Sequence, residues 1–292
     1  MKILITGTKS FIGTNFRRYS KFRNVTELSF LNVEPIETDF DGYNIILHLA
    51  AIVHQDKKIP ESEYLKVNRD LTSDLAQKAK KAGVGQFIFM STSKVYGNKI
   101  NSAGPWKEDT ACYPDDPYGK SKYEAEQELK RLETHDFTVS IIRTPVVYGP
   151  GVKANFLQLT KLIEKSPFLP FAGINNNRHF TYIENLIGFI DRIIETRASG
   201  TFITMDPSGI STSDLVLKIA QKLNPTLINF KLPKTLLNTV SFMIPLKTES
   251  LFGSFLLDNA KTRNVLNYEP PFTSEEGIKK FCDYYFRSKS NL

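Results

Sequence analysis

The sequence predicts an α/β fold in which a doubly wound parallel sheet is followed by a smaller C-terminal region. Two observations lead to this prediction. Short apolar segments alternate with amphipathic ones through the first half of the chain, as in proteins whose helices connect parallel strands. The 292 residues are 41% hydrophobic and 24% charged, which is ordinary for a globular protein and excludes disordered and fibrous chains.

The first half of the chain supplies strands and helices in alternation. The predicted strands are Lys2–Thr6, Val25–Phe30, Asn44–Leu49, Gln86–Ser91 and Thr138–Arg143. The predicted helices are Gly13–Phe22, Arg69–Ala82 and Tyr118–Leu132. In the second helix, apolar residues recur at the helical period and share one face. Since the carboxyl ends of parallel strands meet at one edge of a sheet, the loops that follow them should face one crevice.

The pattern loosens after Gly149-Pro150-Gly151, which we take as the end of the first region. Further helices are predicted at Asn155–Glu164, Ile183–Glu195 and Ser211–Leu223, and one more strand at Gly200–Met205. We expect this strand to return to the first sheet. The expected division is a first domain of residues 1–150 plus roughly 178–205, and a second region of residues 151–177 and 206–292.

Composition also limits the cellular setting and the partners. Cys112 and Cys282 are far apart and stand outside any Cys/His cluster, so we expect neither a disulfide framework nor a metal site. No signal-like segment opens the chain, and the apolar stretch 235–246 is far shorter than the roughly 20 residues that span a bilayer. We expect a cytoplasmic protein without stable membrane insertion. The basic residues behind the net charge of +7 are scattered, so nucleic acid is not an expected partner.

A glycine-containing turn follows the first predicted strand and opens the first predicted helix. At this place, free backbone amides and the positive end of the helix can meet a pyrophosphate, so the turn predicts dinucleotide binding on a Rossmann domain. Ser10 stands where a third glycine would permit close approach, so the phosphates should lie farther off or take a hydrogen bond from its hydroxyl. The expected contacts are Gly7, Lys9, Ser10, Phe11, Ile12 and Gly13.

The choice between NAD and NADP depends on the end of the second strand. Leu28-Ser29-Phe30 offers no carboxylate for a ribose diol, and Lys9 could meet a 2′-phosphate. The cofactor prediction is therefore NAD(P), leaning toward NADP(H). Glu27 and Asn32 flank the region, and a shift of one residue in the strand boundary would weaken the preference.

Tyr118 and Lys122 are four residues apart on a predicted helix and therefore share a face. A neighbouring cation favours the ionised phenol, which should bring the pKa of Tyr118 toward useful acid–base strength. Alone, such a pair is usually a surface feature. Its significance comes from the hydroxyl cluster Ser91–Ser93, which ends an earlier strand at the edge that should face the cofactor.

Together these features resemble the extended short-chain dehydrogenase/reductase superfamily, that is, the NAD-dependent epimerase/dehydratase family. The resemblance extends over nearly the whole chain. The matching segments are Thr6–Gly13, Leu47–Ala51, Val67-Asn68, Ser91–Gly97, Tyr118–Lys122, Arg143–Gly151 and Arg178–Ile183. The resemblance implies that the first domain binds the dinucleotide and that the second region binds a nucleotide-linked sugar.

The resemblance also implies individual roles. Thr92, Tyr118 and Lys122 would be the catalytic trio, and Asn68 would support the cofactor site. Asp39 would lie near the adenine and Pro145 beside the nicotinamide. Leu49, Ala50 and Ala51 would form the wall behind the cofactor.

The residues after Thr92 narrow the reaction. Sugar 4,6-dehydratases of the superfamily carry an Asp-Glu pair at this place, whereas Ser93-Lys94 stands here, so elimination is not expected. The segments Ser91–Gly97 and Val147–Phe156 look closest to UDP-4-keto-6-deoxy-N-acetylhexosamine 4-reductases of surface polysaccharide synthesis. We therefore expect a 4-keto reductase, with a UDP-glucose-type 4-epimerase as the alternative. A non-catalytic, redox-sensing Rossmann protein is a third possibility.

The expected substrate is a UDP-linked sugar, and the resemblance assigns residues to it. Asn155, Phe156 and Arg178 would hold the diphosphate, for which a guanidinium fork has suitable geometry. Thr92 and Ser93 would face the sugar, and Asp258 with Arg263 would reach the nucleotide from a late helix. His54 could contact the sugar or be purely structural. Enzymes of this kind often form homodimers through the helices that correspond to 69–82 and 118–132.

Overall fold

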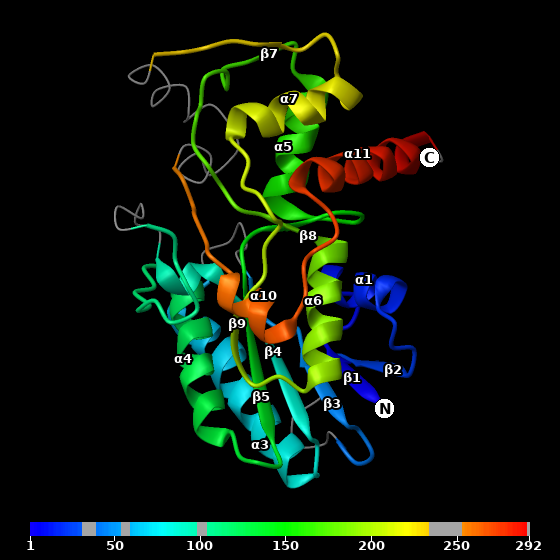
Figure 1. The fold of residues 1–292 in the computed structure, drawn as a ribbon, viewed down its shortest axis with the longest axis vertical. Helices are drawn as coiled ribbons and strands as arrows, with labels where there is room; N and C mark the ends of the chain where they lie inside the picture. The colour runs from blue at the N-terminus through cyan, green and yellow to red at the C-terminus, as the bar shows by residue number, and fades with distance from the viewer. Residues whose placement is uncertain (31–38, 54–58, 98–103, 234–252, 291–292) are drawn as a thin grey trace.

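The computed structural model describes residues 1–30, 39–53, 59–97, 104–233 and 253–290 (Figure 1). His54 and the apolar stretch 235–246 lie outside these residues. The described part contains one six-stranded parallel sheet with helices on both faces, which confirms the predicted fold class. Within this part, no helix is long and apolar enough to cross a membrane.

The strand order of the main sheet is β2-β1-β3-β4-β5-β9. Its strands are β1 (Ile3–Thr6), β2 (Val25–Leu28), β3 (Ile45–His48), β4 (Gln86–Thr92), β5 (Thr138–Thr144) and β9 (Gly200–Ile203). All neighbours pair in parallel. Because β2 and β3 flank β1 on opposite sides, the topology switches there, and a ligand is expected beyond the carboxyl ends of β1 and β3.

Alternation along the strands builds two hydrophobic layers. Ile3 and Ile5 of β1 belong to the layer under α1 (Phe11–Tyr19) and α6 (Ile183–Thr196). Leu4, between them, belongs to the layer under α3 (Leu71–Lys81) and α4 (Pro117–Leu132). The strands are apolar on both faces, as expected for a parallel sheet that helices cover on each side.

The smaller region lies beyond the carboxyl edge of the sheet, at the top of Figure 1. Its helices are α5 (Ala154–Lys165), α7 (Thr212–Leu223) and α11 (Ser274–Ser290). The short pairs are β6 (Val147–Tyr148) with β8 (Thr181–Tyr182), and β7 (Phe168–Leu169) with β10 (Ile228–Asn229). The described residues contain four further helical segments: α2 (Glu61–Tyr64), the π-helical turn Leu65–Asp70, the 3₁₀ turn Ser93–Tyr96 and α10 (Ala260–Leu266). The sequence analysis did not predict α11, and it placed the start of α1 two residues too late.

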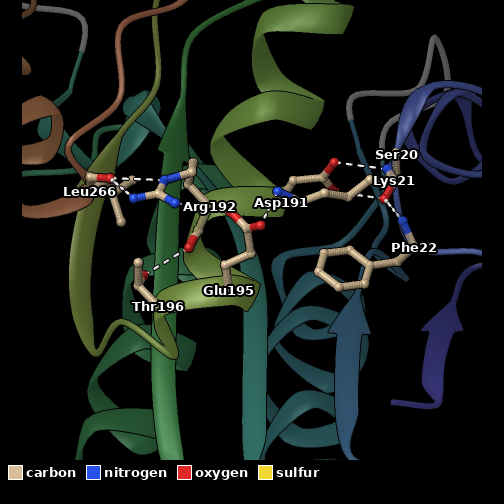
Figure 2. A network of polar contacts seen from close by, with 8 residues as sticks. All are labelled: Ser20, Lys21, Phe22, Asp191, Arg192, Glu195, Thr196 and Leu266. Atoms are coloured by element: carbon tan, nitrogen blue, oxygen red, sulfur yellow. Dashed lines mark hydrogen bonds and ion pairs between the residues drawn. The ribbon is translucent and has the colours of Figure 1, made fainter.

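Helix α6 fastens α1 to α10 across one face of the sheet (Figure 2). Asp191 accepts hydrogen bonds from the Ser20 hydroxyl at 2.6 Å and from the Lys21 amide at 3.0 Å, just after α1. From the next residue of the helix, the Arg192 guanidinium donates to the Leu266 carbonyl at the end of α10, at 2.9 and 3.0 Å. Burial raises the pKa of Asp191, while the two donors oppose this rise. Helix α6 therefore holds α1 and α10 together on this face of the sheet.

His48 is fully buried at the end of β3 and fixes the core beneath the site. Its Nδ1 lies 2.7 Å from the Thr6 hydroxyl and its Nε2 lies 2.9 Å from the Thr72 hydroxyl. The Thr72 hydroxyl donates to the Asn68 carbonyl, so it accepts from Nε2–H, and Nδ1 accepts from Thr6. The neutral imidazole satisfies both contacts. Burial, with a smaller contribution from Lys122, lowers the pKa of His48 to about 3.

We expect this histidine to make folding acid-sensitive. The unfolded chain binds a proton at His48 below its ordinary pKa of 6.5, whereas the folded protein does not until about pH 3. The stabilisation is therefore complete above pH 6.5 and is lost as the pH falls toward 3. From pH 7 to 4.5 the loss is about 2–3 kcal/mol, at roughly 1.4 kcal/mol per unit.

Urea unfolding of His48→Asn at both pH values tests this expectation. The variant should lose less stability on acidification than the wild type, whatever its stability at pH 7. His135→Asn is the control, because that ring is fully exposed. Equal acid losses in wild type and His48→Asn would contradict the assignment.

Candidate active site

The turn after β1 has the backbone that a dinucleotide-binding loop requires. Gly7 has φ of +94°, and a Cβ added there would lie 3.0 Å from the Ala50 nitrogen. The Ser10 hydroxyl accepts a hydrogen bond from the Gly13 amide at 3.1 Å and so caps α1. No hydrogen bond among the described residues uses the amides of Phe11 and Ile12. These two donors at the positive end of α1 fit a pyrophosphate.

The segment after β3 forms a wall beside this turn. The amides of Leu49 and Ala50 donate to the Thr6 hydroxyl at 3.2 and 3.4 Å. The Leu49 side chain lies over Gly13, while Ala50 and Ala51 are half-buried. Asp39 is exposed, and its carboxylate accepts from the Asp41 amide. Pro145, at the end of β5, is buried.

A carboxylate does stand beside the turn, contrary to the expectation drawn from residues 28–30. Strand β2 ends at Leu28, two residues before the predicted boundary, because the pairing with β1 stops at Thr6. Glu27 therefore belongs to the end of β2, and its carboxylate accepts from the Lys9 amide at 3.2 Å. Its side chain is 13% exposed and forms an ion pair with Arg17 at 3.5 Å. The Glu27 carboxylate thus brings negative charge beside the Lys9 amide of the turn.

Thr92 and Tyr118 meet at the carboxyl end of β4. Their hydroxyls are hydrogen-bonded. Gly119 allows this approach, because a Cβ there would lie 2.8 Å from the Lys94 carbonyl oxygen. Asp116 caps α4 by accepting from the Gly119 amide at 2.6 Å, and it also binds the Lys94 ammonium at 2.5 Å. Sequence reasoning overlooked Gly119 and Asp116, although Asp-Pro before a helix is a recognisable capping signal.

Lys122 shares the helix face of Tyr118 but does not act on it as predicted. Its ammonium lies 4.1 Å from the centre of the Phe89 ring, and the residue is 2% exposed. Burial lowers the pKa of Lys122 to about 7, while Glu126 opposes this fall. The pKa of Tyr118 is raised to about 12, chiefly by burial, although the Thr92 hydrogen bond lowers it. The expected lowering of the Tyr118 pKa by Lys122 is therefore wrong: burial raises this pKa, and Lys122 is not among the groups that shift it.

Asn68 supports the site from below. It is fully buried in a π-helical turn, Leu65–Asp70, a local irregularity that often marks functional positions. Its amide donates to the Ile52 carbonyl and to the Ser121 hydroxyl, and its oxygen accepts from the Ile52 amide. All three polar contacts are thus internal. Through these contacts Asn68 holds the loop after β3 against α4, and its direct contact with the cofactor stays a prediction.

The predicted substrate residues lie in different surroundings. Asn155 is exposed at the start of α5, whereas Phe156 is 5% exposed and stacks on Tyr148 in the core. The Phe156 ring therefore faces the core, and the contact of this residue with the diphosphate stays a prediction. Ser93 is also buried, with 4% of its surface exposed, and its contact with the sugar stays a prediction. Arg178 remains a strong candidate, because it is half-buried and has no carboxylate partner among the described residues.

The late segment is arranged differently from the prediction. Asp258 precedes α10 and its carboxylate accepts from the Ala260 amide at 2.9 Å, while Lys107 lies 3.8 Å away. Arg263 pairs with Glu269 at 2.8 Å. Asp258 is thus a capping residue that remains partly exposed, and Arg263 is already neutralised. The described residues contain no cluster of three or more potential metal ligands.

Comparisons with known proteins agree with this geometry. Residues 3–203 match the model of the NAD dependent epimerase/dehydratase family. The UDP-glucose 4-epimerase of Vibrio cholerae is 30% identical over 99% of this chain and 96% of its own. The N-acetyl-alpha-D-glucosaminyl-diphospho-ditrans,octacis-undecaprenol 4-epimerase of Escherichia coli O157:H7 is 26% identical over 96% and 85%. The structure of a Bacillus cereus UDP-glucuronic acid 4-epimerase with NAD superimposes with a TM-score of 0.77 at 22% identity, covering 99% of each chain. The chain therefore belongs to the NAD dependent epimerase/dehydratase family and is an enzyme of that family.

Proposed function

We propose that this enzyme is a UDP-sugar 4-epimerase that removes and returns hydride at C4 of the sugar. The observation that carries the proposal is the hydrogen-bonded pair Thr92 and Tyr118 at the carboxyl end of β4, beside the glycine turn of β1. The Vibrio cholerae relative, which matches nearly the whole chain, bears this name. Elimination is disfavoured, because Lys94 is committed to Asp116 and no acidic pair follows Thr92.

The residues present fit a nicotinamide dinucleotide. The unpaired amides of Phe11 and Ile12, at the end of a helix, provide the donors for its pyrophosphate. When bound, NAD supplies the acceptor and the donor of hydride. The residues proposed to hold it are Gly7, Lys9, Ser10, Phe11, Ile12, Gly13, Asp39, Leu49, Ala50, Ala51, Tyr118, Lys122 and Pro145.

Tyr118 and Thr92 handle the proton of the reacting hydroxyl. The Tyr118 phenolate takes the proton from the C4 hydroxyl, and Thr92 hydrogen-bonds the same oxygen. When hydride returns to the other face of the sugar, Tyr118 gives the proton back. When Lys122 is protonated and lies close to Tyr118, its positive charge favours the phenolate form of Tyr118. Arg178 and the exposed Asn155 hold the diphosphate, and Asp258 lies toward the nucleotide.

A second candidate is the 4-reductase reaction on a UDP-4-keto-6-deoxy-N-acetylhexosamine. It is favoured by the segments Ser91–Gly97 and Val147–Phe156, which look closest to enzymes of that kind. In that reaction Tyr118 only donates a proton to the developing alkoxide, and the cofactor leaves oxidised. The same residues serve both reactions.

Product analysis with two substrates separates the candidates. An epimerase converts UDP-glucose or UDP-N-acetylglucosamine to its C4 epimer over a bound NAD that is not consumed. A reductase consumes one NADH or NADPH for each UDP-4-keto sugar and leaves the 4-hydroxy sugars unchanged. Absence of both reactions, with cofactor still bound, would overturn the proposal.

We also propose that NAD is preferred over NADP, because the Glu27 carboxylate would repel a 2′-phosphate. Glu27 stands twenty residues after Gly7, the spacing at which an acidic residue binds the adenosine ribose in Rossmann domains. The wild type should bind NADH at least about tenfold more tightly than NADPH. Glu27→Gln should reduce this ratio by about tenfold, equivalent to ~1.4 kcal/mol.

Titration of the cofactor fluorescence measures both affinities. Lys9→Ala provides the opposite test, since its ammonium would attract the 2′-phosphate. Tighter NADPH binding in the wild type, lost on Lys9→Ala, would show that the lysine governs the preference instead.

The division into a cofactor domain and a substrate region, and homodimerisation through α3 and α4, also remain proposals. The two helices contact each other on one face of the sheet, so they form one continuous surface. Light scattering of the purified protein distinguishes a monomer from a dimer.

A further inference from the structure

Arg178 is held by aromatic side chains rather than by a carboxylate. Its guanidinium carbon lies 5.7 Å from the centre of the Phe255 ring, and Nη1 donates to the Gly253 carbonyl at 2.6 Å. Burial alone lowers the pKa of Arg178, to about 10, which leaves it cationic at neutral pH. Since neither contact neutralises the charge, the guanidinium is oriented but remains available to an anion.

Phe255 is itself the middle of a longer stack. Its ring meets the Trp106 ring edge-on at 4.8 Å and 62°, and Trp106 stacks on Tyr96 at 5.5 Å and 9°. Tyr96 is 3% exposed, and its hydroxyl accepts from Arg143 at 3.0 Å. The stack therefore starts at a rigid buried group and ends at Arg178.

The backbone holds the same segments together. Trp106 donates to the Leu256 carbonyl at 3.0 Å, and the Asp258 amide donates to the Trp106 carbonyl at 2.8 Å. On the other side, Phe255 donates to the Asn177 carbonyl at 2.8 Å, and His179 donates to the Phe255 carbonyl at 3.1 Å. Residues 255–258 thus lie between Trp106 and the extended segment 177–179, which contains Arg178.

We propose that Phe255 and Trp106 are positioning residues that fix the Arg178 guanidinium for the diphosphate of the nucleotide-sugar substrate. The inference rests on the proposed function, because it needs a nucleoside diphosphate at Arg178. A long arginine side chain loses rotamer freedom when it binds, and the ring of Phe255 removes much of that freedom beforehand. Trp106 keeps the Phe255 ring in place, although it does not touch the guanidinium itself.

UDP binding tests the proposal, with isothermal calorimetry as the measurement. Phe255→Ala and Trp106→Ala should each weaken UDP by about tenfold, within the range of cation–π contributions. Arg178→Ala should weaken it by about a hundredfold, as expected for charge-assisted hydrogen bonds. The conservative variants Phe255→Tyr and Trp106→Phe should retain affinity. Phe286→Ala, an exposed phenylalanine on α11, is the control.

The split between KM and kcat and the tryptophan emission distinguish a positioning role from a general loss of stability. Phe255→Ala should raise KM with little change in kcat, because the reacting oxygen is held elsewhere. Trp106 is the only tryptophan of the chain, so UDP should change its emission in the wild type and not in Arg178→Ala. Normal UDP affinity in Phe255→Ala and Trp106→Ala, together with loss in Arg178→Ala, would overturn the positioning role and leave the proposed function intact. A wild type that does not bind UDP would overturn both.

Discussion

Tyr118→Phe is expected to reduce turnover by about 10²- to 10⁴-fold, the usual contribution of a general acid–base group. The substitution removes only the hydroxyl that meets Thr92 and leaves the ring in place. Affinity for UDP should remain, because Arg178 is unaffected. Initial rates at saturating substrate, measured with UDP binding on the same preparation, give both quantities.

Tyr113→Phe is the matched control, because its ring is 72% exposed in the loop before α4. It should turn over at the wild-type rate.

The pH dependence of turnover also bears on the role of Tyr118. Burial raises the pKa of Tyr118 to about 12, so a protonated Lys122 close to the phenol would favour activity near neutrality by lowering it. Wild-type turnover by Tyr118→Phe would refute the acid–base role.

Glu126→Gln is expected to destabilise the fold by about 3–5 kcal/mol, since it leaves a buried guanidinium without its counter-ion. Arg143 donates to the Glu126 carboxylate at 2.6 Å, and the two side chains are 3% and 0% exposed. The Ser91 hydroxyl donates to the same carboxylate at 2.5 Å. The pair therefore joins β4, β5 and α4, whose ends carry Thr92 and Tyr118.

Glu128→Gln, on the same helix, provides the comparison. Glu128 pairs with Arg131 at 2.7 Å, but both are exposed, so its loss should change the free energy of unfolding by less than about 0.5 kcal/mol. Denaturant unfolding of the two variants measures the difference. If Glu126→Gln and Glu128→Gln unfold at equal denaturant midpoints, the loss of the buried Glu126 charge does not destabilise the fold as expected.

The sequence predicts the main sheet well, because inner strands such as β1 and β3 are buried on both faces and read as short, largely apolar runs. The positions of Gly7 and Thr92 at strand ends, and of Tyr118 in the first turn of a helix, follow from the same pattern. Individual boundaries are less certain, as β2 illustrates. The predicted strand Val25–Phe30 extends two residues beyond Leu28, because the pairing with β1 stops at Thr6, and periodicity within so short a strand cannot reveal this.

Other features depend on contacts between distant segments. Phe255 and Trp106 are 149 positions apart, and neither belongs to a motif, so only the folded chain brings them to Arg178. Phe156 shows the reverse problem. Asn155 is exposed, whereas the next residue of the same helix, Phe156, points into the core. The fall in the Lys122 pKa likewise depends on the depth of burial, which spacing along a helix does not give.

The late position of β9 in the chain affects the order in which the protein can fold during synthesis. When residue 150 leaves the ribosome, five strands of the sheet are complete, but β5 is still an open edge. Gln86 and Ser140, both buried in the finished sheet, bind the carbonyls of Ile193 and Ala198. Until those residues emerge, the nascent sheet carries unpaired polar groups and an edge that can pair with other chains. We therefore expect chaperone association to persist until about residue 206, and truncation at residue 150 to give an aggregating fragment.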